Sequence, residues 1–106
     1  MDSEYCIVFV TCANESQAQA IASAVLENRH AACVNIVPGV RSLYWWNGAV
    51  QDDSELLCIM KTRTDRFEAL RDAVAQVHAY DVPEIIAMPI SAGHQPYLNW
   101  INDSVR

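Results

Sequence analysis

The side chains best suited to chemistry in this sequence are one cysteine and one histidine. Cys33 opens a predicted strand and His78 follows a predicted helix. A thiolate and an imidazole are ligands that copper and zinc favour, so the pair predicts a metal site if folding or assembly brings the two together. They could also form a thiolate–imidazolium pair, but no orienting motif or nucleophile elbow accompanies them. The structural alternative is a small buried thiol and a histidine that caps a helix.

A lysine at the end of an apolar row is the next candidate. Lys61 alternates with Leu57 and Ile59, so the three share one face of a predicted strand. Its ammonium group would reach the surface, bind an anion, or pair with Glu84. His30 and His94 stand alone in predicted loops, and we interpret both as solvated.

Aromatic side chains gather at the tip of a predicted hairpin. Tyr44, Trp45 and Trp46 directly precede the turn, where packing against another subunit is favoured over a ligand-stacking platform. The acidic run from Asp52 to Glu55 lies just beyond the turn, and we interpret it as a solvated strand edge.

Composition excludes several classes of protein. The 106 residues carry a net charge of −6, and their seven basic side chains are scattered, so we expect no nucleic-acid partner. No apolar run approaches the roughly 18 residues of a membrane span. The sequence begins with an acidic segment instead of a secretory signal. We therefore expect the four cysteines to be free thiols in the cytoplasm, without disulfides or an organic cofactor.

The elements that would position these residues alternate in type along a single domain, residues 1–106. Strands are predicted over 5–12, 33–46, 49–62 and 84–88, because these runs are apolar or β-branched and the Asn47-Gly48 pair is a hairpin turn signal. Pro38-Gly39 predicts a bulge in the hairpin. Helices are predicted after Asn14 and after Asp65, each with a capping-box pattern, and from Pro96 onward. The order β-α-β-β-α-β plus a C-terminal helix predicts an α+β ferredoxin-like sandwich.

The hairpin from Cys33 to Thr62 is long for so small a protein. Each arm has about 14 residues, whereas strands usually have about 5–6. No small sheet would cover its aromatic tip, so we expect the chain to work as an oligomer.

Five strings of the sequence are informative together. They are Ala32-Cys33-Val34-Asn35-Ile36, Ser42-Leu43-Tyr44-Trp45-Trp46-Asn47-Gly48, Lys61-Thr62, His78-Ala79-Tyr80-Asp81-Val82-Pro83-Glu84-Ile85 and Tyr97-Leu98-Asn99-Trp100. In this order they resemble the CutA divalent-cation-tolerance family. The resemblance implies a homotrimer joined through the long hairpins, with Tyr44, Trp45 and Trp46 at the interface. It implies binding of copper or other divalent cations and no catalytic reaction.

The resemblance also assigns site residues. Cys33 and His78 match the positions of the family's metal ligands, and Cys12 is a possible third ligand because some members carry a thiol slightly earlier on that strand. Lys61, Tyr80, Glu84 and Trp100 would line a polar cleft near a subunit interface. The family usually reads His-Pro-Tyr where this chain has His78-Ala79-Tyr80. By analogy with the trimeric PII signalling proteins, the alternative function is a signalling module that binds a small anion between subunits.

Overall fold

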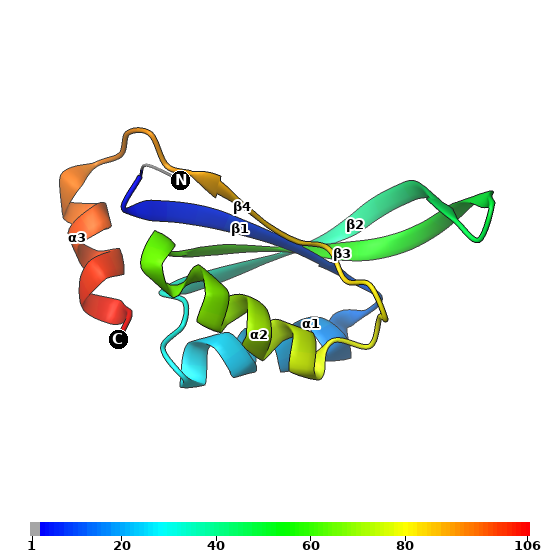
Figure 1. The fold of residues 1–106 in the computed structure, drawn as a ribbon, viewed down its shortest axis with the longest axis horizontal. Helices are drawn as coiled ribbons and strands as arrows, with labels where there is room; N and C mark the ends of the chain where they lie inside the picture. The colour runs from blue at the N-terminus through cyan, green and yellow to red at the C-terminus, as the bar shows by residue number, and fades with distance from the viewer. Residues whose placement is uncertain (1–2) are drawn as a thin grey trace.

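The structure, a computed structural model, describes residues 3–106 and shows a two-layer α+β fold (Figure 1). Met1 and Asp2, which the predicted domain includes, lie outside the described residues. The elements in chain order are β1 (Tyr5–Cys12), α1 (Glu15–Glu27), β2 (Cys33–Trp46), β3 (Ala49–Arg63), the 3-10 turn η1 (Thr64–Arg66), α2 (Phe67–Val77), β4 (Ile85–Pro89) and α3 (Gln95–Ser104). This order confirms the predicted succession of strands and helices.

The four strands form one antiparallel sheet in the order β2-β3-β1-β4. Helices α1 and α2 lie side by side across one face, and α3 lies at the end of the sheet away from the hairpin tip (Figure 1). Two interleaved β-α-β units of this kind make the ferredoxin-like sandwich that the sequence predicted.

The hydrophobic core lies between the sheet and the two helices. Every second residue of β1 is fully buried there, and α1 and α2 contribute the facing apolar side chains. The main core members are Cys6, Val8, Val10, Cys12, Ile21, Val25, Cys58, Met60, Leu70 and Val74.

The opposite face of the sheet is also apolar, yet neither α1 nor α2 covers it. Ile86 and Met88 of β4 are 53% and 54% exposed, and they lie opposite Phe9 and Ile7 of β1. We call this surface the open sheet face and define it by Ile7, Phe9, Leu57, Ile59, Ile86 and Met88. Within one chain, β1 is therefore packed against α1 and α2 on one face only.

The hairpin of β2 and β3 extends well beyond the sheet, and the protein is 44 Å long as a result (Figure 1). Asn47 and Gly48 both have positive φ angles, 51° and 76°, as a two-residue hairpin turn requires. The pairing register shifts between Val37 and Val40, which confirms the bulge predicted at Pro38-Gly39. Trp45 at the tip is 74% exposed.

The two predicted capping boxes have different outcomes. Asn14 caps α1 through a hydrogen bond from the Gln17 backbone N–H to its Oδ1 (2.9 Å), so half of the first predicted box is confirmed. The Gln17 side chain contacts Val77 and Ala79 instead of returning to the Asn14 backbone N–H. The prediction for Asp65 and Glu68 is wrong, because η1 precedes α2 and no side chain caps the helix. The Asp65 carboxylate instead accepts a 2.9 Å hydrogen bond from Arg63 Nε.

Among residues 3–106, no helix is both long enough and apolar enough to cross a membrane.

Candidate functional site

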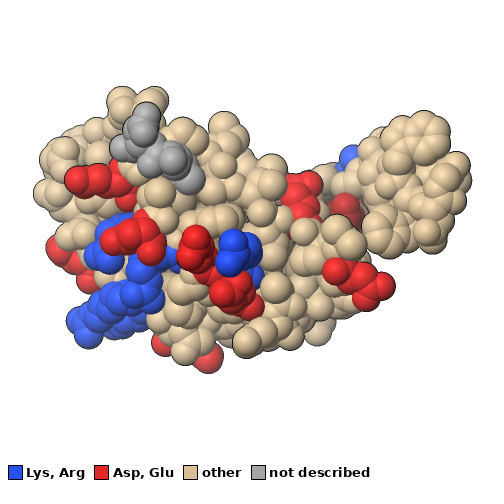
Figure 2. Space-filling view, in the orientation of Figure 1, with Lys and Arg blue, Asp and Glu red and all other residues tan. Residues whose placement is uncertain are grey.

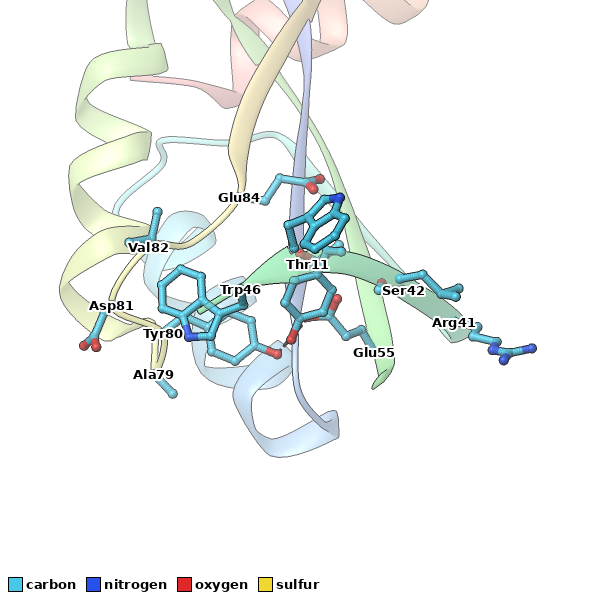
Figure 3. Close-up of a pocket in the computed structure, with 13 residues that line it drawn as sticks. Thr11, Arg41, Ser42, Trp46, Glu55, Ala79, Tyr80, Asp81, Val82 and Glu84 are labelled. Atoms are coloured by element: carbon cyan, nitrogen blue, oxygen red, sulfur yellow. Dashed lines mark hydrogen bonds between the residues drawn. The ribbon is translucent and has the colours of Figure 1, made fainter. Parts of the chain in front are cut away.

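A cleft of about 770 Å³ lies between the long hairpin and the loop that joins α2 to β4 (Figure 3). We call it the hairpin cleft. Residues 41–46 of β2 form one wall, residues 79–82 and 84 form the other, and Thr11 and Glu55 complete the lining. Of the predicted cleft residues it includes Tyr80 and Glu84.

The charged groups that line the hairpin cleft are mainly acidic. Glu55, Asp81 and Glu84 contribute carboxylates, and the single cation is Arg41. The Arg41 guanidinium makes two hydrogen bonds to the Asp52 carboxylate (2.9 and 2.7 Å) and points away from the other labelled side chains in Figure 3. The cleft therefore suits a cationic group better than an anionic one.

Glu55 is the most deeply buried charged side chain of the cleft, with 7% of its surface exposed. Tyr80 donates a 2.7 Å hydrogen bond from its hydroxyl to Glu55 Oε2. Burial raises the pKa of Tyr80, and the hydrogen bond to Glu55 raises it further, so the phenol stays protonated. The interpretation of Glu55 as part of a solvated edge is wrong, because Tyr80 covers it.

The His78 ring lies 4.7 Å from the Tyr80 ring, and both of its nitrogens have hydrogen-bond partners. Nε2 lies 2.8 Å from the carbonyl oxygen of Thr11, and Nδ1 accepts a 3.1 Å hydrogen bond from the Tyr80 backbone N–H. Because a carbonyl can only accept, Nε2 must carry the proton and the Nδ1 lone pair is already used. His78 therefore presents no free lone pair to a metal ion in this conformation.

The turn that carries His78 and Tyr80 is held by a side chain of α1. Gln17 donates from Nε2 to the carbonyl of Val77 (3.1 Å), and its Oε1 accepts from the Ala79 backbone N–H (2.6 Å). A proline at position 79 would lack that N–H. The departure from His-Pro-Tyr thus provides a donor that ties the loop to α1.

Cys33 lies at the other end of the sheet, in a group that we call the Cys33–Lys61 cluster. Cys33 and Lys61 are direct partners in the β2–β3 ladder, and both contact the Oδ1 atom of Asn35, the thiol at 3.7 Å. Burial raises the pKa of the Tyr97 phenol on α3, and the neighbouring Cys33 thiol raises it further. The rings of Tyr97 and Trp100 are 5.5 Å apart. Lys61 and Trp100 were predicted to line one cleft together with Tyr80 and Glu84. They lie near Cys33 instead, at the other end of the sheet from Tyr80 and Glu84.

The predicted metal ligands do not come together within one chain. Lys61, the partner of Cys33, lies opposite Ile7, whereas His78 contacts Thr11 four residues farther along β1. At about 3.3 Å per residue, that offset alone is about 13 Å. Among the residues that the structure describes, no three His, Cys, Asp or Glu side chains are grouped as a metal ion requires.

The third candidate, Cys12, is fully buried. Burial raises the pKa of its thiol, and burial beside Cys12 raises the pKa of Cys58 to about 12. Both sulfurs are therefore protonated and are poor metal ligands as they stand. Cys33 is the one partly exposed thiol among the four.

Two features of this region were not predicted from the sequence. One is the place of Glu55 in the cleft, and the other is the pair of hydrogen bonds from Gln17 to Val77 and Ala79, which we call the Gln17 clamp. The alternation that placed Lys61 on an apolar face also places Glu55 there, two residues before Leu57. The Gln17 contacts join residues 60 and 62 positions apart, and no local pattern signals them.

Comparison with known proteins gives consistent matches over nearly the whole chain. The family described as "CutA1 divalent ion tolerance protein" matches residues 6–104. The rice protein "Protein CutA 1, chloroplastic" is 47% identical over 100 residues, which cover 94% of this chain and 56% of that protein. The Thermus thermophilus "Divalent-cation tolerance protein CutA" is 47% identical over 98 residues, covering 92% of this chain and 95% of that protein. The chain thus spans about half the length of the rice, mouse and human relatives.

Solved structures agree with these matches. The crystal structure of CutA1 from Oryza sativa superposes with a TM-score of 0.94 at 45% identity, covering 98% of this chain and 95% of that chain. The Thermus thermophilus divalent cation tolerance protein gives a TM-score of 0.93 at 45% identity, covering 96% and 99%.

Proposed function

The chain belongs to the CutA1 divalent ion tolerance family, and from that membership we propose that it contributes to the tolerance of divalent cations as a metal-binding homotrimer. The family name refers to ion tolerance and names no reaction, and we propose that the protein is not an enzyme. Four free thiols are compatible with a reducing compartment, so the proposed location is the cytoplasm.

The open sheet face is the observation that carries the proposed assembly. It is a second apolar face on a sheet whose first face is already packed against helices, and its Ile86 and Met88 are more than half exposed. Single soluble chains rarely expose apolar surface of this kind.

The hairpin adds a second apolar surface. Leu43, Trp45 and Val50 are each at least 55% exposed at its tip. Figure 2 shows that the tip has almost no charged side chains on the visible face. Burial against other copies would remove both surfaces from water at about 25 cal/mol per Å². The number of copies, three, is what the family resemblance implies.

The metal-binding part of the proposal rests on the family and on Cys33. A partly exposed thiol is a suitable donor for copper and other soft cations. Because one chain does not gather Cys33, His78 and Cys12, we propose that a complete ligand set requires side chains from different subunits. His78 would have to exchange one of its two backbone contacts for the metal.

The alternatives have less support. An anionic ligand beside Tyr80 would face the carboxylates of Glu55, Asp81 and Glu84, whereas Lys61 lies in the other cluster. A catalytic thiolate–imidazolium pair would require Cys33 and His78 to touch, and in one chain they do not.

Metal titration tests the proposal directly. Purified protein is titrated with Cu(I), Cu(II) and Zn(II) by calorimetry, alongside Cys33→Ser, His78→Gln and the control His94→Gln, which alters an exposed histidine. We expect stoichiometric binding in the wild type and the control, and at least tenfold weaker binding in the other two. Equal affinity in all four proteins would remove the metal assignment.

A further inference from the structure

His30, on the loop between α1 and β2, is a second histidine whose ring has a defined partner. Its Nδ1 atom lies 3.1 Å from a terminal guanidinium nitrogen of Arg66, the last residue of η1. Because a guanidinium group can only donate, Nδ1 must be unprotonated and His30 must be neutral. The interpretation of His30 as solvated is wrong, since the residue is partly buried and Arg66 contacts its ring. His94 is exposed, as predicted.

The Arg66 side chain depends on this contact. Within residues 3–106 it makes no other hydrogen bond, and its Nε is buried without a partner. It also belongs to none of the ion pairs of those residues, since the adjacent Asp65 carboxylate is bonded to Arg63. A partly buried guanidinium group therefore has the lone pair of a neutral histidine as its acceptor, and losing that acceptor would be costly.

The other groups around His30 come from β3 and from the segment that follows α3. The Thr62 hydroxyl of β3 donates a 2.6 Å hydrogen bond to the His30 carbonyl oxygen. Arg29 donates to the carbonyl oxygen of Ser104 (3.2 Å), and its own carbonyl oxygen accepts from the Arg106 N–H (3.3 Å). Arg29, Arg106 and the terminal carboxylate are thus the other charged groups at this loop. None of these hydrogen bonds uses the His30 ring.

Backbone hydrogen bonds also hold the loop. The N–H groups of His30 and Ala31 donate to the Val25 carbonyl oxygen at the end of α1 (2.8 and 3.2 Å). The Ala32 N–H donates to the Lys61 carbonyl oxygen of β3 (2.8 Å), so this amide reports whether the loop is docked on the sheet. Of the contacts that dock the loop, only the one between the His30 ring and η1 changes when a side chain gains a proton.

We propose that the His30–Arg66 contact is a proton-sensitive latch, which holds the loop between α1 and β2 against β3 and η1 at neutral pH and releases it in acid. Protonation of Nδ1 replaces the acceptor by a donor and places an imidazolium beside a guanidinium that is always charged. The hydrogen bond is then lost and the two cations repel each other, so the loop opens.

The direction of the pH dependence follows from the two states of the loop. In the closed loop, burial lowers the pKa of His30 and the charge of Arg66 lowers it further. In the open loop His30 is in water, where the pKa of a histidine is about 6.5. As the pH falls below about 6.5, the open loop therefore binds the proton first, and the opening equilibrium increases by up to about tenfold per pH unit.

Amide hydrogen exchange measured by NMR on the full protein, without added metal, tests the latch. The exchange rate of the Ala32 N–H is divided by its intrinsic rate at each pH and compared with that of Val8, a fully buried residue of β1. Between about pH 7.5 and about pH 5 we expect the protection of Ala32 to fall at least about threefold more than that of Val8. In the same samples the His30 ring should titrate at lower pH than the exposed His94.

Two variants separate the latch from general acid destabilisation. His30→Asn supplies a side-chain oxygen that accepts a hydrogen bond and does not titrate, so the protection of Ala32 should be retained at about pH 5. Arg66→Met removes the donor and its charge but keeps an unbranched stem. In that variant the protection of Ala32 should be low at both pH values, and His30 should titrate closer to His94. Arg71→Met, the same change at an exposed arginine of α2, should behave like the wild type.

Three results would each overturn the latch. The first is an Ala32 protection that changes no more than that of Val8 in the wild type. The second is an acid loss in His30→Asn as large as in the wild type. The third is a His30 ring that titrates together with His94.

Discussion

The conformation of the His78–Tyr80 turn depends on Gln17, and the dependence can be measured. Gln17→Met preserves side-chain length and helix propensity but removes the hydrogen bonds to Val77 and Ala79 (3.1 and 2.6 Å). A hydrogen bond contributes about 0.5–1.5 kcal/mol, and Gln17 is only partly buried. We therefore expect the free energy of unfolding to fall by about 1–2 kcal/mol.

Ala79→Pro removes the N–H donor without straining the preceding residue. His78 has φ −72° and ψ 137°, which lies in the region that a residue before proline adopts. The lost hydrogen bond costs about 1 kcal/mol. The lower entropy of the unfolded chain returns about 0.4–1 kcal/mol. The net change should be within about 0.5 kcal/mol.

The two substitutions should therefore be coupled. With Ala79→Pro already present, Gln17→Met loses only the Val77 contact, so the coupling energy is expected to be about 1 kcal/mol. Urea unfolding followed by circular dichroism measures it, at one protein concentration because assembly makes stability concentration-dependent. Gln19→Met is the matched control, since Gln19 bonds only to Ser23. If the changes in the free energy of unfolding caused by Gln17→Met and Ala79→Pro add to within about 0.3 kcal/mol, the proposed hydrogen bond between Gln17 and the Ala79 N–H would be refuted.

Three further predictions concern the cleft, the thiols and the core. Tyr80→Phe leaves the buried Glu55 carboxylate without its donor, so unfolding in urea should require about 1–3 kcal/mol less, and adding Glu55→Gln should recover part of the loss; an unchanged stability would contradict the pairing. The pKa of Cys58 is about 12 in the folded chain and about 8.5 in the unfolded chain, so above pH 9 the folded state holds more protons. The free energy of unfolding should therefore fall by up to about 1.4 kcal/mol per pH unit, and less steeply in Cys58→Ala. A free energy of unfolding that does not change between pH 9 and about pH 11 would be inconsistent with this. Leu70→Ala removes a fully buried side chain and should lower stability by about 2–5 kcal/mol in the same assay, whereas a loss below 1 kcal/mol would place Leu70 outside the core.

Local patterns were sufficient to predict most of the fold. Asn47-Gly48 specifies a turn with two positive φ angles, and Pro38-Gly39 interrupts the ladder, so the hairpin could be predicted from backbone chemistry alone. The capping of α2 could not, because Asp65 has Arg63 as a competing partner two residues away.

The site was predictable as a set of residues but not as an arrangement. Cys33, Lys61 and Trp100 belong to one end of the sheet, and His78, Tyr80 and Glu84 belong to the other. Strand register and the path of the loop after α2 decide that division, and both depend on contacts between residues distant in the sequence. The contacts of Gln17 with Val77 and Ala79 also join distant residues, so the local pattern after Asn14 could not indicate them.

The mass of the wild-type protein in solution tests the central claim most directly. If the open sheet face and the hairpin tip are covered by other copies, light scattering after gel filtration should give three times the mass of a single chain, and Met88→Lys should reduce it, because that substitution places a charge on the exposed apolar row. A wild type with the mass of one chain, at micromolar concentration and physiological salt, would contradict the claim that these apolar surfaces assemble the protein.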